Sequence, residues 1–231
     1  MAEPITPRRR RARPRSAPGR PTKERAEERH AELLDSALDL FLARGFEPTT
    51  IEAIAASVGM TKRTVYARYP DKVSLFRAAV RRAIEQLAVP PERIRAADCG
   101  DLEQTLINLA RLRVDPVTTP QGLKLQRIIN TESYRFPDIF TTSYDLGALP
   151  VARFLARLLE RETRAGRLAI HEPALAANVF LSMVVGGPVR ILASGNVLPE
   201  KEIDRRIRFA VRLFLDGARR RPDPSGSGGM R

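Results

Sequence analysis

The stretch from residue 49 to residue 72, which reads TTIEAIAASVGMTKRTVYARYPDK, constrains the fold of this chain more than any other. Thr50 is a favourable N-cap for a short helix whose apolar residues share one face. Gly59 ends that helix in a tight turn, Thr61 can cap a second short helix, and Pro70 stops it. Two short helices joined in this way form a helix-turn-helix, whose second helix can enter the major groove of DNA.

The second of these helices has an apolar face and a polar face, since successive side chains are about 100° apart. Val65 and Tyr69 fall on the inward face. The outward face and its flanks carry small and basic side chains, which is what entry into a groove needs. The candidate DNA-binding residues are Thr50, Thr61, Lys62, Arg63, Thr64, Tyr66, Ala67, Arg68 and Lys72.

Several of these residues suit a particular contact with DNA. The Arg63 guanidinium can pair bidentately with O6 and N7 of guanine. Thr64 can hydrogen-bond a base edge or meet a thymine methyl group, and Ala67 is small enough to allow close approach. Contacts to phosphates are expected from Thr50, Lys62, Tyr66 and Lys72. The alternative is a helical hairpin with a solvated charged face, which accounts less well for the turn glycine and the paired threonine caps.

Positive charge is concentrated in two places. The formal net charge is +13, and residues 1–23 hold eight basic residues against one acidic residue. Acidic residues outnumber basic ones over residues 24–72, yet residues 62–72 carry four basic residues and one aspartate. The positive potential is therefore aimed at an anionic partner, and double-stranded DNA fits the neighbouring motif.

The first 22 residues are rich in arginine and proline and are expected to be disordered when the chain is free. Phosphate contacts are predicted for a basic arm formed by Arg8, Arg9, Arg10 and Arg11. A solubilising tail is the alternative. The arm also supports a second function, a nonspecific or architectural DNA-binding protein without preference for a palindrome.

The rest of the chain follows helical periodicity, and convincing β alternation is absent, so we expect an all-α fold. Helices are predicted at about 24–44, 51–58, 62–69, 71–88, 101–114, 121–134, 137–146, 149–165, 173–194 and 199–220, separated by proline and glycine. The predicted divisions are a disordered arm (1–22), a three-helix helix-turn-helix domain (23–72), a connecting helix (73–90), a larger helical domain (91–221) and a flexible tail (222–231).

Residues 19–76 resemble the N-terminal domain of the TetR family of bacterial repressors. The shared elements are the GRP lead-in, LFLARGF at the end of the first helix, TTIEAIA in the second, and TVYARYPDKVSLF across the third and fourth. The resemblance implies a homodimer that binds a palindrome-like operator, and a helical C-terminal domain that binds a small molecule and dimerises. Many members have a small residue where this chain has Arg63, so the operator sequence stays open.

A second, looser resemblance covers ERETRAGRLAIHEPALAANVFLSMVVGG, which is similar to the C-terminal domain of one TetR subgroup. The last two predicted helices are apolar on most sides, so each must be buried on most sides. One domain offers one core, and a second burial surface indicates a partner subunit; a plain intramolecular core is the alternative. The predicted dimer residues are Ala177, Phe180, Leu181, Val184, Val185, Phe209 and Leu213.

The resemblance also implies a small-molecule pocket among the middle helices. Such sites are mostly apolar and contain a few placed polar groups. The candidate pocket residues are Leu106, Leu109, Ile128, Asn130, Tyr134, Phe136, Phe140, Tyr144, Phe154 and Met183. Each of these residues is also a plausible core residue.

No cofactor, metal site or catalytic role is expected. Cys99 is the only cysteine, and His30 and His171 are far apart in sequence, so no metal-ligand motif is present. An all-helical enzyme would need a catalytic constellation, and the sequence contains none. No apolar run reaches the roughly 18 residues that span a membrane, and the basic N-terminus lacks the apolar segment of a secretory signal. The chain is therefore predicted to be cytoplasmic, without a membrane partner.

Overall fold

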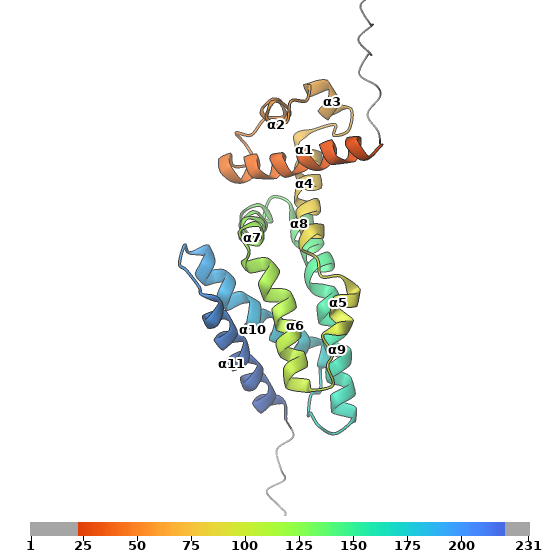
Figure 1. Ribbon diagram of the computed structural model, residues 1–231, viewed down its shortest axis with the longest axis vertical. Coiled ribbons are helices and arrows are strands. Elements are labelled where there is room, and N and C mark those ends of the chain that lie inside the picture. Colours follow the sequence, from red (N-terminus) through yellow and green to blue (C-terminus); the bar gives the residue numbers. More distant parts are fainter. Residues whose placement is uncertain (1–22, 220–231) are drawn as a thin grey trace, which may run out of the picture.

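The computed structural model describes residues 23–219 as an all-α fold with an N-terminal helix-turn-helix domain above a larger helical domain (Figure 1). In chain order the helices are α1 (Lys23–Arg44), α2 (Ile51–Ser57), α3 (Lys62–Tyr66), α4 (Lys72–Leu87), α5 (Pro91–Ala96), α6 (Leu102–Thr118), α7 (Pro120–Glu132), α8 (Pro137–Ser143), the π-helix η1 (Tyr144–Ala148), α9 (Leu149–Arg164), α10 (Pro173–Ala193) and α11 (Glu200–Ala218). The predicted arm, with Arg8–Arg11, and the predicted tail lie outside the described residues.

Two separate clusters of buried side chains hold the molecule together. The N-terminal core contains apolar residues of α1, α2, α3 and α4, as the amphipathic patterns predict, and it also contains residues of α7 and α8. Rings of Phe41, Phe46 and Phe76 meet there, with centroids of Phe76 5.0 Å from each of the other two. Phe136, at the corner between α7 and α8, completes the cluster 5.1 Å from Phe46. Apolar packing therefore crosses the domain boundary predicted near residue 90.

Ion pairs follow the same line of contact. Arg77 on α4 lies 2.8 Å from the carboxylate of Asp138 on α8. Lys124 on α7 lies 3.0 Å from that of Asp39 on α1. Arg135 pairs with Glu47 in the loop after α1, and its guanidinium lies 4.7 Å from the Phe46 ring centroid. The segment formed by α7 and α8 is thus joined to the N-terminal domain by several ion pairs.

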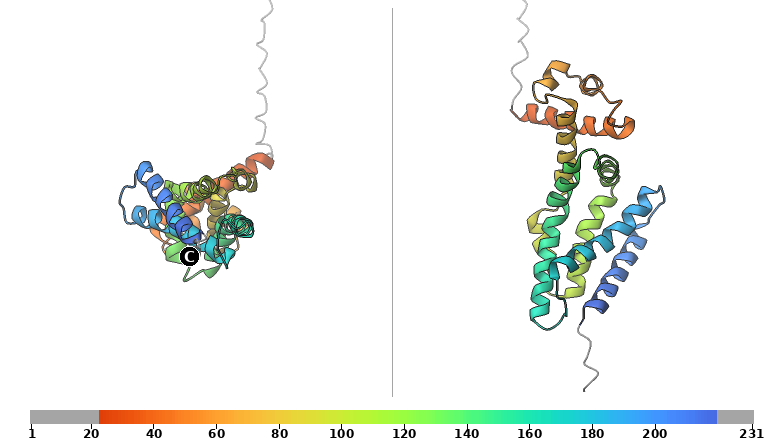
Figure 2. Two further views of the ribbon diagram at one scale, coloured as in Figure 1. Left: turned by 90° about the horizontal axis from the view of Figure 1, so that it is seen from below. Right: turned by 180° about the vertical axis from the view of Figure 1, so that it is seen from behind.

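The C-terminal core is built from α5, α6, α9, α10 and α11. Helix α10 contacts α6, α9 and α11, and Figure 2 shows it crossing the bundle between α9 and α11. Contrary to the sequence-based expectation, this 21-residue helix, with a mean hydropathy of 1.7, is long and apolar enough to span a membrane by length and composition alone. One third of its apolar window is buried in the bundle, and Leu175 and Val179 are among the apolar side chains of the helix that stay exposed.

Proline breaks the helices less often than predicted. Helix α6 continues through Pro116 to Thr118, because only one backbone bond is lost near its end and the hydroxyl of Thr118 donates to the carbonyl of Val114 (3.0 Å). Pro91 starts the short helix α5, which was not predicted, since proline is compatible with a first helical turn. Residues 137–164 run continuously through η1, although a break was predicted before Pro150.

The junction of α6 and α7 depends on a glycine. A Cβ atom placed on Gly122 would lie 2.2 Å from the carbonyl oxygen of Pro116 and 2.7 Å from Cα of Val117. These neighbours are backbone atoms, which cannot move aside as a flexible side chain can. Close approach of the two helices therefore requires glycine here.

Candidate nucleic-acid interface

The two short helices of the predicted helix-turn-helix, α2 and α3, begin at the predicted caps. The Thr50 hydroxyl accepts a hydrogen bond from the Ala53 N–H (3.2 Å), and the Thr61 hydroxyl accepts one from the Thr64 N–H (3.1 Å). Between the helices Gly59 has φ +61°, a left-handed conformation that favours glycine. Each helix is thus capped at its N-terminus by a threonine, and Gly59 allows the tight turn between them.

The inward face of α3 is also as predicted. Val65 is fully buried and belongs to the N-terminal core. Helix α3 ends at Tyr66, three residues earlier than predicted, yet the chain continues in a turn in which the N–H of Tyr69 donates to the Val65 carbonyl (2.9 Å). Tyr69 is half-buried, and its hydroxyl lies 2.5 Å from Nε2 of His30 on α1. These contacts hold α3 against α1.

The opposite side of α3 is open to solvent. Thr61, Lys62, Arg63, Thr64, Tyr66, Ala67 and Arg68 are all exposed, in one continuous segment. Within residues 23–219 the side chains of Arg63 and Arg68 make no hydrogen bond or ion pair, and only their backbone groups bond within the turn. Their guanidinium groups are therefore available to an external partner, and the site supplies donors that suit guanine edges or phosphates.

Lys62 is already paired within the protein. Its ammonium group binds the carboxylate of Glu52 on α2 and lies 5.4 Å from the centroid of the Tyr66 ring. The hydrogen bond from Lys62 lowers the pKa of Glu52, and the Glu52 carboxylate raises the pKa of Lys62. Both groups are more than half exposed, so a phosphate can compete for this lysine.

Lys72 is bound more firmly, in a position that the sequence did not indicate. Its Nζ donates to the carbonyl oxygens of Phe46 (2.9 Å) and Glu47 (2.8 Å) and lies 3.7 Å from the Glu47 carboxylate. Two N–H bonds of the ammonium group thus have protein acceptors, and the Glu47 carboxylate is near enough for an ion pair. The predicted phosphate contact of Lys72 stays a prediction.

The candidate pocket residues do not gather around one cavity. Leu106 and Leu109 are fully buried in the C-terminal core, whereas Ile128 and Phe136 are buried in the N-terminal core. Asn130, Tyr134 and Phe140 are exposed, Tyr134 to 96%. Tyr144, Phe154 and Met183 are half-buried. The assignment of these residues to a ligand pocket stays a prediction, and the ring of Phe136 contacts Phe46 and Phe76 of the N-terminal domain.

The predicted dimer residues divide into two groups. Ala177, Phe180 and Leu181 are buried inside the chain's own core, so the structure contradicts their assignment to a surface between subunits. Val184 is buried in the same core and belongs with these three residues, and Val185 is half-buried. Phe209 and Leu213 on α11 are exposed to 61% and 55%.

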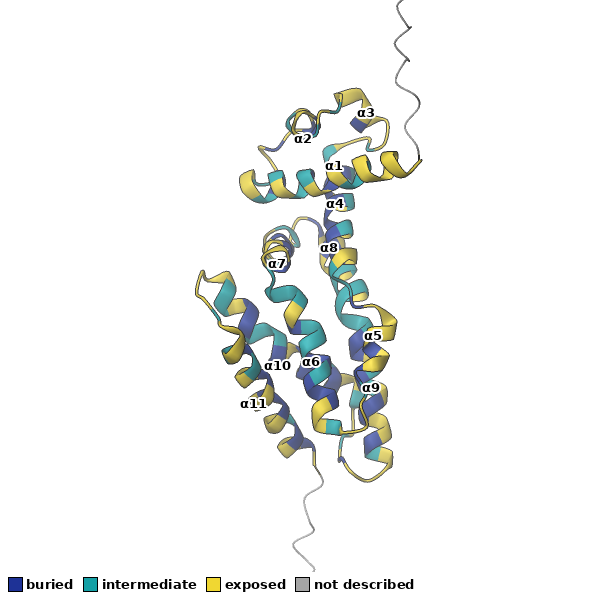
Figure 3. Ribbon diagram, viewed as in Figure 1, coloured by how far each residue is buried: buried dark blue, intermediate teal, exposed yellow. Residues whose placement is uncertain are grey.

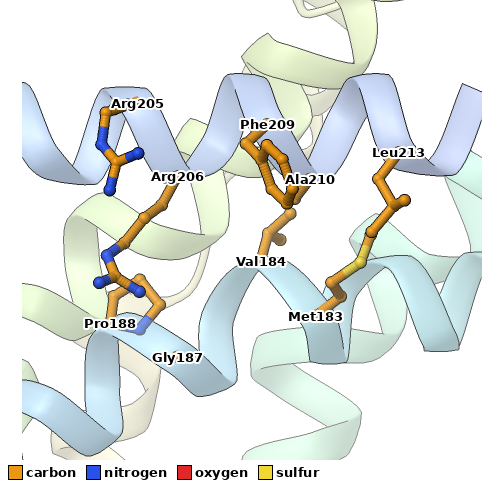
Figure 4. A pocket seen from close by; sticks show the side chains of 9 residues that line it. All are labelled: Met183, Val184, Gly187, Pro188, Arg205, Arg206, Phe209, Ala210 and Leu213. Carbon is orange, nitrogen blue, oxygen red and sulfur yellow. The ribbon is translucent and has the colours of Figure 1, made fainter.

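We define an open apolar face as Leu175, Val179 and Met183 of α10 with Phe209 and Leu213 of α11, of which all but the half-buried Met183 are exposed. Figure 3 shows exposed positions along α11. Figure 4 shows Phe209 reaching toward Val184 and Leu213 toward Met183, at the edge of a hollow of about 340 Å³. An adjacent hollow of about 530 Å³ includes Leu175 and Val179. Sequence reasoning missed these last two because both faces of α10 are apolar.

Comparison with known proteins identifies the family. Residues 33–79 match the profile of bacterial regulatory proteins of the tetR family, and residues 104–217 match the C-terminal domain of AefR-like transcriptional repressors. The structure of the flavonoid-responsive regulator FrrA has a TM-score of 0.66 and 31% identity, over 85% of this chain and 100% of that one. The chain belongs to the TetR family. This TetR-family protein is thus a transcriptional regulator, and its α2–α3 helix-turn-helix lies within the matched N-terminal profile.

Two further relatives bear on the extent of the likeness. A TetR-family regulator from Mesorhizobium loti MAFF303099 has the same fold, with a TM-score of 0.69 and 24% identity over 84% of this chain and 98% of that one. The HTH-type transcriptional regulator Rv1556 of Mycobacterium tuberculosis is 39% identical over 84 residues, or 36% of this chain. That match spans 39% of the curated relative's length.

Proposed function

We propose that this TetR-family regulator is a homodimeric repressor that a small apolar or amphipathic ligand releases from a palindrome-like operator. The observation that carries the proposal is the position of Phe136. A residue from the larger domain lies in the core of the DNA-binding domain, within 5.3 Å of Phe76 between ring centroids. A ligand that shifts α7 and α8 would therefore also shift α4, on which the helix-turn-helix packs.

The open apolar face supports the dimer. Monomeric proteins rarely expose a continuous apolar patch of this kind, and burial against a second copy would remove it from water. Two helix-turn-helix units related by a two-fold axis would read half-sites about 34–36 Å apart, one turn of DNA. Coupling is reciprocal, so operator DNA would weaken ligand binding as strongly as the ligand weakens operator binding.

The ligand class rests on the relatives and on the packing of the larger domain. FrrA is described as flavonoid-responsive, which supports a small-molecule effector without identifying the one used here. The C-terminal core is chiefly aliphatic, and a ligand that enters it must present an apolar surface. We infer no catalytic role for this chain, and a cytoplasmic location, where the operator DNA lies.

Selection of genomic fragments bound by the purified full-length dimer tests the operator. We expect a palindrome beside one set of genes, and a steep salt dependence without sequence preference would favour a nonspecific binder instead. A ligand identified from that gene set should lower operator affinity. Tight binding of such a ligand with unchanged operator affinity would refute the release mechanism.

Two substitutions test the helix-turn-helix. Arg63→Ala should cost roughly 1–3 kcal/mol of operator binding and relax one base position if Arg63 reads guanine. Lys72→Ala separates two roles for that lysine. A phosphate contact predicts weaker binding to all sequences and a salt slope reduced by about one. An anchor of the α1–α2 loop predicts lower folding stability with the slope unchanged.

A further inference from the structure

One charged side chain lies in the layer between the two cores. Arg113 is on α6, next to Val114 of the C-terminal core. Burial lowers the pKa of the Arg113 guanidinium, although arginine stays protonated at neutral pH. A cation in such a place is costly unless an anion or several acceptors accompany it.

The partners of Arg113 are few. Its Nη1 donates to the carbonyl oxygen of Gly147 (2.9 Å), and its Nε is buried without a partner. Within residues 23–219 no carboxylate pairs with it. Arg111, two residues earlier, provides the contrast, because it binds Asp204 at 2.8 Å and Asp115 at 3.4 Å. The fold thus neutralises one arginine of α6 and leaves the next without a counter-ion.

The single acceptor belongs to the π-helix η1. Pro150 has no N–H to donate to the carbonyl of Leu146, and the backbone instead forms a wider turn in which the Leu149 N–H bonds to the Tyr144 carbonyl. None of the residues of η1 is buried. Single π turns inside helices are frequent at functional sites.

Neighbouring contacts place η1 between the two halves of the molecule. Leu146 packs against the N-terminal core, whereas Val151 belongs to the C-terminal core. The hydroxyl of Tyr144 donates to Oδ1 of Asn178 (3.1 Å), so a hydrogen bond also joins η1 to α10. A group bound at Arg113 would therefore act on the segment that leads directly back to α8.

We propose that Arg113 binds the acidic group of an amphipathic effector whose apolar body lies among the helices of the larger domain. The inference rests on the proposed ligand response and adds the charge of the ligand to it. A carboxylate, sulfonate or phenolate supplies the anion that the chain itself does not. The guanidinium offers its unpaired Nε–H together with Nη2, the fork on the side away from the Gly147 contact, for a two-point hydrogen bond to such a group.

A matched pair of fluorescent probes tests this assignment. Anilinonaphthalene sulfonate carries an acidic group, and phenylnaphthylamine has the same aromatic body without it. We expect full-length wild-type protein to bind the sulfonate about tenfold or more tightly than the amine, because hydrogen bonds to charged groups are the stronger ones. Arg113→Gln should abolish this preference, whereas Arg157→Gln, an exposed position on α9, should retain it.

Two outcomes would overturn the assignment: equal affinity of wild type for both probes, or an unchanged preference in Arg113→Gln. If Arg113→Gln does not fold, Arg113→Lys keeps the charge but loses the fork. That variant should retain part of the preference, and full retention of the wild-type value would also contradict fork-shaped recognition.

Operator affinity measured with the sulfonate present separates the two proposals. Binding that depends on Arg113 but leaves operator affinity unchanged would leave this site standing and remove ligand-controlled release. Loss of operator affinity with equal response to both probes would support ligand-controlled release and remove the Arg113 site.

Discussion

Phenylalanine rings from α1, α4 and the α7–α8 corner meet in the N-terminal core, whereas the C-terminal core is built mainly of leucine, isoleucine, valine and alanine. The first core joins segments of both domains and is closed around Phe76. The second is covered by α10 and α11, whose outer sides leave the open apolar face. One core thus links the two domains, whereas the other lies beneath the face that we propose for dimerisation.

The largest expected effect comes from breaking the closed core. Phe136→Ala removes a buried ring and should lower the free energy of unfolding by about 3–5 kcal/mol. Urea unfolding followed by circular dichroism measures this loss. Phe140→Ala is the matched control one turn later, at a position that is 60% exposed, and should stay within about 0.5 kcal/mol of wild type.

Equal and small effects of the two phenylalanine substitutions on unfolding would contradict the closed N-terminal core. If Phe136→Ala lowers only ligand affinity, Phe136 lines the ligand pocket, as predicted from the sequence.

The open face should respond in assembly rather than in folding of the single chain. Leu213→Glu places a charge on an apolar surface and should weaken dimerisation by about 2 kcal/mol or more. Sedimentation at several concentrations measures the dissociation constant. Arg212→Glu, at the neighbouring exposed position, controls for the added negative charge. A dimer that tolerates Leu213→Glu as well as Arg212→Glu would show that subunits meet elsewhere.

The smallest effect concerns acid and distinguishes the two regions again. Burial, and then the charges of Arg68 and Arg82, lower the pKa of His30 in the folded chain. The unfolded chain therefore binds a proton first, and the stability that neutral His30 contributes is lost as the pH falls below about 6.5. Acidification from pH 7.5 to 5.5 should destabilise wild type more than His30→Gln.

His171, which is exposed beyond the C-terminal core, supplies the control for this titration. His171→Gln should keep the full wild-type dependence on pH. Identical pH profiles for wild type and His30→Gln would remove His30 as the source.

Prediction from sequence succeeded where local chemistry decides the structure. The Thr50 and Thr61 caps, the inward position of Val65 and the helical fold follow from signals within a few residues. It failed where distant segments compete for the same apolar side chain. Periodicity identified Ala177 as apolar but did not show that its face turns inward while the face of Val179 turns outward.

Tertiary context also explains the other misses. Nothing near Phe136 in sequence indicates that Phe46, in the loop after α1, and Phe76 on α4 pack against its ring. The burial of Arg113 was missed for the same reason. Pro116 was taken for a break because the sequence does not show that Thr118 satisfies a carbonyl of the last turn.

The pair between Lys62 and Glu52 gives operator binding the character of an ion exchange. A phosphate that binds Lys62 must displace the Glu52 carboxylate. The free energy gained is therefore only the difference between the Lys62–phosphate and the Lys62–Glu52 interactions. The exposed carboxylate of Glu52 is then hydrated, and its pKa, which the hydrogen bond from Lys62 lowers, returns toward its ordinary value. The Lys62–Glu52 pair thus reduces the free energy that Lys62 gains from a phosphate in any DNA sequence. Selectivity is then expected to depend on side chains such as Arg63, which break no internal ion pair when they bind.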